Sequence, residues 1–138
     1  MINIFKKSKK LRYFLRNIEK TKKNGNIPYT LIIYGNISVD LQIFARIALK
    51  YFDFEYDNNF GFVIIVFFNK NKDNNELYLS RFKSNKYFDL FTMIEKDGND
   101  NYILDCKDNI DKTEIIALDI LKNVFDHKIV KTKNVTLY

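Results

Sequence analysis

The sequence predicts an α+β fold, with an antiparallel meander sheet of about five strands and three helices: one N-terminal, one after the first strand and one near the C-terminus. Three observations predict this class. Apolar residues recur at helical spacing in the first and last parts of the chain. Between them, short β-branched and aromatic runs follow one another through brief polar turns, which favours antiparallel pairing. The 138 residues are 46% hydrophobic and 16% aromatic, which suits one packed domain over residues 1–138.

The first predicted element is a basic amphipathic helix within residues 1–23. This segment contains nine Lys and Arg residues and one Glu, so its net charge is +8. An apolar stripe at helical spacing predicts that one side of the helix packs against the rest of the domain. The stripe consists of Leu11, Phe14, Leu15 and Ile18. On another side lie the basic residues that we expect to contact a partner: Lys9, Arg12, Arg16, Lys20 and Lys23.

The middle of the chain predicts strands and one more helix. Residues 29–34 have the composition of a buried strand. Residues 39–52 predict the second helix, because Ser38 suits an N-cap and apolar residues recur at helical spacing. Residues 60–68 are apolar on both faces, which predicts the central strand of the sheet. Residues 76–82 alternate between apolar and polar and predict a further strand.

The last part of the chain predicts a hairpin followed by a helix. Two strands, within residues 87–94 and 101–106, flank a loop over residues 96–100. A helix begins near Asp111 and ends near His127, and residues 129–137 predict a final strand or an edge. The inner stripe of that helix consists of Ala117, Ile120, Leu121 and Val124.

The residue inventory excludes several kinds of chemistry. One Cys and one His exclude a typical zinc site, and the four Gly residues never cluster into a phosphate-binding loop. We therefore expect no cofactor and no metal. Cys106 is predicted to be a small buried hydrophobe, and His127 a cation that suits the C-terminus of a helix. A lone cysteine also favours a reducing compartment.

Asp89, Asp105 and Lys107 form the one arrangement with catalytic potential. If Glu95 pairs with Asn101, all three charges share one side at the open end of the hairpin. This corner resembles that of the PD-(D/E)xK nucleases, whose hairpin carries an acid and then acid-x-Lys. The resemblance covers this hairpin alone; Asp89 follows no proline, and position 105 is Asp rather than the more usual Glu. It implies carboxylates that hold Mg²⁺ and a lysine that orients water; the simpler interpretation is an Asp89–Lys107 ion pair worth ~0.2–1 kcal/mol.

A second candidate contact surface is acidic. Asp53, Glu55 and Asp57 alternate with aromatic residues, so on a strand the three acids would share one face. Such a face is typical of a solvated edge strand. It is equally suited to meeting a basic partner.

We expect a cytoplasmic, non-catalytic module that binds another protein. Acidic and basic residues are segregated along the chain, and aromatic residues are abundant, which suits protein recognition. The helix–sheet–helix layout resembles that of bacterial toxin-neutralising immunity proteins and of secretion-chaperone-like adaptors. The alternative is a nucleic-acid-binding protein or metal-dependent nuclease that uses the basic helix and the Asp89, Asp105 and Lys107 corner. The longest apolar run, residues 62–68, is too short to span a membrane, and association of several copies stays open.

Overall fold

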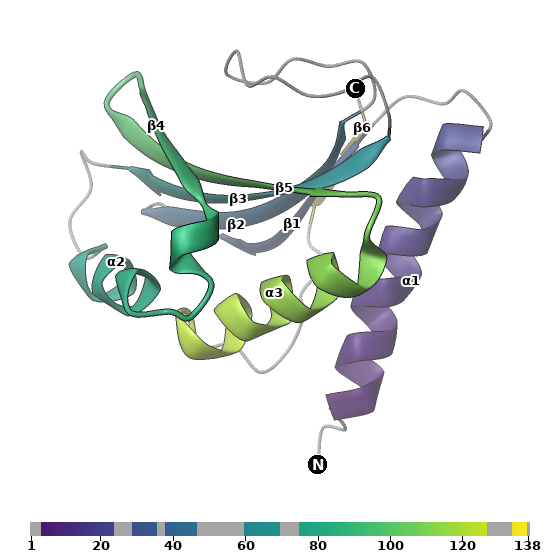
Figure 1. Cartoon of the computed structure of the whole chain (residues 1–138), viewed down its shortest axis with the longest axis horizontal. Helices are drawn as coiled ribbons and strands as arrows, with labels where there is room; N and C mark the ends of the chain where they lie inside the picture. Colours follow the sequence, from purple (N-terminus) through teal and green to yellow (C-terminus); the bar gives the residue numbers. More distant parts are fainter. Residues whose placement is uncertain are drawn as a thin grey trace.

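The chain folds into one antiparallel sheet with helices packed against one of its faces (Figure 1). The computed structural model describes residues 4–23, 29–35, 38–46, 60–69, 75–126 and 134–137. The predicted α+β class, with three helices, is confirmed. The helical elements are α1 (Ile4–Lys23), α2 (Glu76–Lys83), a short 3₁₀ turn η1 (Phe88–Leu90) and α3 (Ile110–Asn123). The strands are β1 (Tyr29–Gly35), β2 (Val39–Arg46), β3 (Gly61–Asn69), β4 (Thr92–Lys96), β5 (Asn99–Lys107) and β6 (Asn134–Leu137).

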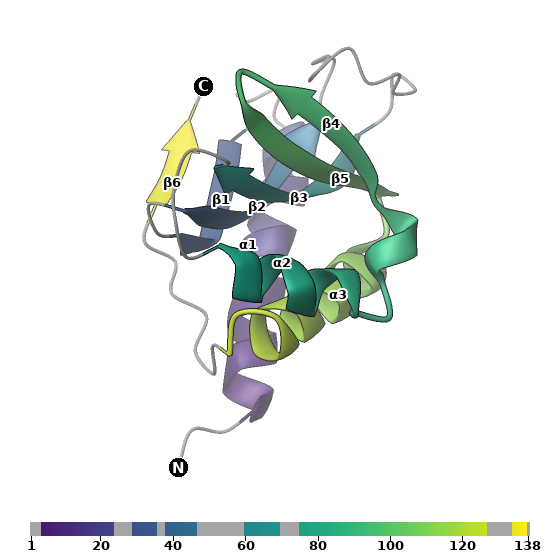
Figure 2. The same cartoon turned by 90° about the vertical axis from the view of Figure 1, so that its left-hand side faces the viewer.

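The strand order is β4-β5-β3-β2-β1-β6, and all neighbours are antiparallel. Consecutive strands pair from β1 to β3, but α2 and η1 then carry the chain to the far edge, where β4 lies, and β5 returns beside β3. The sheet is therefore not a simple meander. Figure 2 shows β4 and β6 at opposite edges, with the helices below the sheet. As predicted, 60–68 supplies the central strand, β3.

The helix predicted over residues 39–52 is wrong in its first part, because Val39–Arg46 is strand β2. From Val39 to Ile43, apolar residues alternate with polar ones, and a period of two suits a strand and not a helix. β2 buries alternate side chains against the helices: Val39, Leu41 and Ile43. The remainder of that predicted helix falls outside the described residues.

The second helix of the fold is α2, so the strand predicted over residues 76–82 is also wrong. Phe82 is fully buried, and Tyr78 and Leu79 pack partly buried against the same core. These positions recur at helical spacing, whereas Leu77, which the alternation placed inward with Leu79, is 57% exposed. The middle helix therefore follows β3 rather than β1.

The main core lies between the helices and the sheet. The predicted stripe of α1 faces it: Leu11, Leu15 and Ile18 are fully buried, and Phe14 is partly buried. The predicted inner stripe of α3 is likewise buried in this core. Its floor is one face of the sheet, and it includes Cys106 on β5, as predicted. A smaller cluster on the opposite face contains Phe44, Val63, Ile65 and Ile103.

Candidate functional site

The basic helix α1 is fastened to α3 by one arginine. The Nη2 of Arg12 lies 2.9 Å from Oε1 of Glu114 and also pairs with Oδ1 of Asp111. The Nε of Arg12 donates to Oε2 of Glu114 at 3.2 Å. The pKa of Arg12 is raised well above its ordinary value. The largest cause is hydrogen bonding to Glu114, and the second is hydrogen bonding to Asp111. Arg12 pairs with the protein's own third helix, and its predicted contact with a partner stays a prediction.

The side of α1 opposite its buried apolar stripe faces outward. Tyr13 is 62% exposed, and Arg16 and Lys20 are exposed as well. The three residues are separated by three and four positions, so they lie along one side of the helix. Lys9 and Lys23, the other predicted contacts on α1, belong to the helix backbone, and their side chains fall outside what the structure describes. The described outward face of α1 is therefore an aromatic ring beside two cations.

The hairpin that was predicted to carry a catalytic corner has a different register. Glu95 pairs with Asp100 rather than with Asn101. The reason is the turn: Asp97 and Gly98 both have positive φ, 55° and 76°, so the loop is a two-residue turn of the type I′ kind and not five residues long. A shift of one residue moves every side chain of a strand to the other face.

The corner is consequently not assembled. Asp89 lies in the 3₁₀ turn η1 before β4, and no ion pair joins it to Lys107. Asp105 lies on the face opposite the helices, and its Oδ1 accepts a hydrogen bond from the backbone N–H of Lys107 at 2.9 Å. Within the described ranges, no group of three or more His, Cys, Asp or Glu residues is placed to hold a metal ion. The geometry that motivated the nuclease resemblance is thus absent from the hairpin.

Two further predicted features fall where the structure gives no description. Asp53, Glu55 and Asp57 all lie between Arg46 and Phe60, outside the described residues. The same holds for His127, three positions after the end of the buried stripe of α3. The acidic contact surface of Asp53, Glu55 and Asp57 stays a prediction from the sequence.

The single cysteine is a core residue. Cys106 is 2% exposed, and burial raises the pKa of its thiol to about 11. A hydrogen bond with Thr113 on α3 and the charge of Lys112 act in the opposite direction and are the weaker effects. A thiol with these properties is a poor nucleophile at neutral pH.

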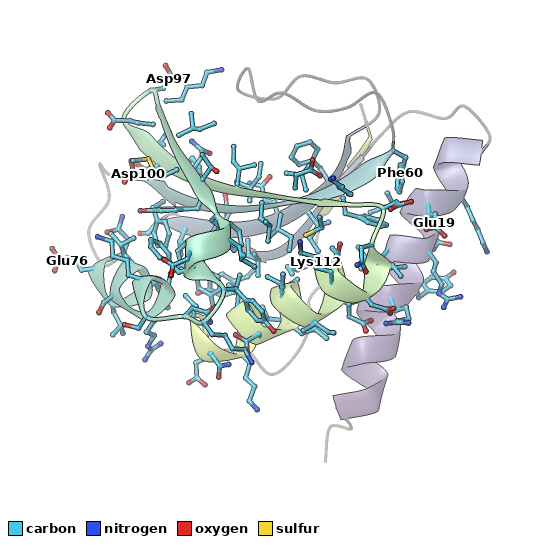
Figure 3. All side chains as sticks on the ribbon, viewed as in Figure 1. Glu19, Phe60, Glu76, Asp97, Asp100 and Lys112 are labelled. Carbon is cyan, nitrogen blue, oxygen red and sulfur yellow. The ribbon has the colours of Figure 1, made fainter. Side chains whose placement is uncertain are left out.

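Sequence reasoning missed a hollow on the sheet face opposite the helices. It has a volume of about 330 Å³. Its walls come from β2, β3 and the β4–β5 hairpin, whose tip is marked by Asp97 in Figure 3. The lining residues are Asp40, Gln42, Ile65, Phe67, Lys96, Asp97, Asn99 and Asn101. The alternation along β2 would have revealed two of its polar groups, because it places Asp40 and Gln42 on one face.

A second hollow, of about 390 Å³, lies between the end of α2 and α3. Asp119 is one of its lining residues, and its carboxylate accepts hydrogen bonds at 2.9 Å from the side-chain amides of Asn85 and Asn123. Lys86 lies 3.7 Å from the same carboxylate. Because these three neighbours already satisfy Asp119, this cluster serves to hold the loop after α2 against α3.

Comparison with known proteins gives no further assignment: no family model matches the chain, and no match was found among curated proteins or solved structures. In the part of the chain that the structure describes, no helix has the length and hydropathy needed to cross a membrane.

Proposed function

We propose that the protein is a non-catalytic module that binds an acidic surface of another protein through the outward face of α1. The observation that carries this proposal is the exposure of Tyr13 beside Arg16 and Lys20 on a helix whose other side is held by the core. Tyr and Arg are the residue types enriched where binding energy concentrates in protein interfaces.

The fixed position of α1 supports recognition. Its inner stripe is buried, and Arg12 ties it to α3, so the helix needs little further ordering when a partner binds. Binding surfaces that are already ordered lose less conformational freedom on association. The basic charge of α1 would also speed encounter with an acidic partner.

A cytoplasmic toxin-neutralising immunity protein or a secretion-chaperone-like adaptor fits this description at the level of layout. Both are non-catalytic modules that work by binding another protein, and an α+β domain with helices on one face of a sheet suits such a role. The single cysteine of the chain agrees with a reducing compartment.

Nucleic acid is the second candidate partner. An exposed aromatic ring among cations is also the surface on which bases of a single strand stack. The acidic balance of residues 24–128, with 12 basic and 16 acidic side chains, weighs against phosphate binding outside α1. The protein partner is therefore the preferred proposal.

The test compares two charge reversals of equal size. The double variant Arg16→Glu/Lys20→Glu changes the outward face of α1, and Lys83→Glu/Lys122→Glu changes exposed lysines on α2 and α3. We expect affinity capture from the native cell, quantified by mass spectrometry, to lose the same protein partner in the first variant only. Equal loss in both variants would contradict a specific role for α1. Tight, salt-steep binding of single-stranded DNA or RNA by the wild type would favour the second candidate.

A further inference from the structure

We infer that the hollow on the sheet face opposite the helices binds an arginine side chain of a basic partner peptide. The site differs from the proposed α1 surface, because α1 packs on the helical side of the sheet and the hollow lies on the other side. The inference stands without the proposed function of α1.

The hollow is arranged around one aromatic ring. Phe67 on the central strand β3 lies directly opposite Asp40 on β2 and opposite Asn101 on β5. These three residues form a row across the sheet on a single face. Ile65, two residues before Phe67 on the same strand, completes an apolar floor. The floor is therefore a ring with a carboxylate on one side and an amide on the other.

The charged side chains that line the hollow carry a net charge of −1, and amide side chains make up the rest of its polar lining. Asp40 and Asp97 contribute two carboxylates, and Lys96 contributes one cation. The Oδ1 atom of Asn99 is buried and accepts no hydrogen bond from any described residue. A buried acceptor without a donor is unfavourable, so a ligand that brings N–H groups would be stabilised here.

Asp40 adds a second reason to expect a cation. Burial raises the pKa of its carboxyl group, and a hydrogen bond from the Gln42 side chain only partly opposes this effect. A carboxylate that has lost part of its hydration gains from a cation held at close range. Lys96 and Asp97 are the other charged groups lining the hollow, and their charges cancel.

The chemistry selects a guanidinium among cations. Its planar face stacks on an aromatic ring while its edge donates to a carboxylate and to amide oxygens. Phe67, Asp40 and Asn101 offer that combination in one row. An ammonium group cannot stack and donate in this way, and a neutral sugar would leave the carboxylate of Asp40 uncompensated. Because the ligand is one side chain, the remainder of the partner peptide lies outside the hollow.

Three capped tripeptides test the inference: acetyl-Gly-X-Gly-amide, in which X is arginine, lysine or citrulline. Citrulline has the shape of arginine without its charge. We expect the arginine peptide alone to shift the side-chain amide signals of Gln42, Asn99 and Asn101 in a saturable way in NMR titrations. Asp40→Asn should weaken this binding at least about tenfold, and Asp89→Asn, an exposed aspartate outside the hollow, should leave it unchanged.

Several results would overturn the inference. They are equal shifts with the citrulline or lysine peptide, no saturable binding of the arginine peptide, and equal weakening by Asp40→Asn and Asp89→Asn. Concentration-dependent self-association that Asp40→Asn removes would show that a second copy of the chain occupies the hollow instead. Amide spectra of both variants establish that they are folded, and Phe67→Leu, which keeps the floor apolar, should independently weaken arginine binding.

Discussion

Arg12 of α1 and Glu114 of α3, 102 positions apart in the chain, are joined by three hydrogen bonds. The Nη2 and Nε atoms of Arg12 donate to Oε1 of Glu114 at 2.9 and 3.3 Å, and Nε also donates to Oε2 at 3.2 Å. The Glu114 side chain is only 7% exposed, so the contact is shielded from water on the acidic side. Among the described basic side chains of α1, Arg12 holds the helix against α3, whereas Arg16 and Lys20 are exposed.

Replacing Arg12 should therefore destabilise the protein more than replacing its neighbour Arg16. Arg12→Ala leaves the buried carboxylate of Glu114 without its partner, while Arg16→Ala removes an exposed charge. Arg12→Lys should recover only part of the lost stability. The lysine keeps a positive charge beside Glu114, but an ammonium group cannot form the paired contact that the guanidinium makes. Circular dichroism during thermal unfolding gives the melting temperatures of the three variants. Equal melting temperatures for Arg12→Ala and Arg16→Ala would contradict this prediction.

The apolar stripe of α1 should contribute strongly to stability. Leu15 is fully buried, so Leu15→Ala is expected to lower the free energy of unfolding by ~2–5 kcal/mol. The control is Tyr13, which lies two positions earlier and is 62% exposed. Tyr13→Ala should change the free energy of unfolding by no more than about 0.5 kcal/mol. Urea denaturation gives both values. A small effect of Leu15→Ala would mean that α1 does not depend on the core for its position.

The type I′ turn predicts different costs for its two residues. Gly98 has a φ of 76°, so Gly98→Ala should destabilise the hairpin by about 1–2 kcal/mol. Asp97→Asn should be nearly neutral, because asparagine suits the first central position of such a turn equally well. Denaturant midpoints of the two variants test this contrast, which would fail if both changes had the same effect.

Cys106 should be protected from thiol reagents in the folded protein. With its pKa near 11, about one thiol in a thousand is ionised at pH 8, and the side chain is 2% exposed. Reaction with Ellman's reagent should follow the unfolding of the chain and become rapid in urea. Since the unfolded thiol loses its proton at lower pH than the folded one, this group should also reduce stability as pH rises from about 9 to 11.

The partly buried carboxylate of Asp40 should lower the free energy of unfolding at neutral pH, where this group is ionised. Burial raises its pKa above the ordinary value of 3.8, so the folded state holds the proton to higher pH than the unfolded chain. Its contribution to stability is therefore greatest at acidic pH and falls as pH rises through these pKa values. Asp40→Asn is expected to raise the urea midpoint at pH 7 and to have little effect at pH 3. A lower midpoint at pH 7 would contradict this reasoning.

Periodicity and composition predicted the elements whose side chains face one core. The apolar spacing of α1 and α3 and the two-sided apolar character of β3 predict the observed elements, because burial on one or both faces leaves a direct pattern in the sequence. The strand β6 was placed within the right segment, and it lies at the sheet edge beside β1.

The errors arose where two periods competed. β2 alternates from Val39 to Ile43, but the apolar residues that follow Ile43 also fit helical spacing, and the longer of the two patterns predicts a helix. In α2, the alternation of Leu77 and Leu79 concealed the anchoring role of Phe82, which contacts the rings of Phe88, Phe91 and Tyr102. Only the tertiary structure shows which of two compatible faces is buried.

The candidate sites were the least predictable features. The Asp97-Gly98 pair is the sequence signal for a two-residue turn, and a turn of this length implies the observed pairing of Glu95 with Asp100. The contact of Arg12 with Glu114 and the row of Asp40, Phe67 and Asn101 join distant segments. A single sequence holds no local signal for such pairs.

The position of α1 against α3 has a consequence for synthesis on the ribosome. The basic helix emerges early, but Glu114, which binds Arg12, is made about a hundred residues later, and β6 follows it to pair with β1. Until then, Leu11, Leu15 and Ile18 have no completed core to enter. The nascent chain thus carries a cationic helix with an uncovered apolar side until α3 has been made. This interval is when a chaperone or an anionic surface has the best opportunity to capture it.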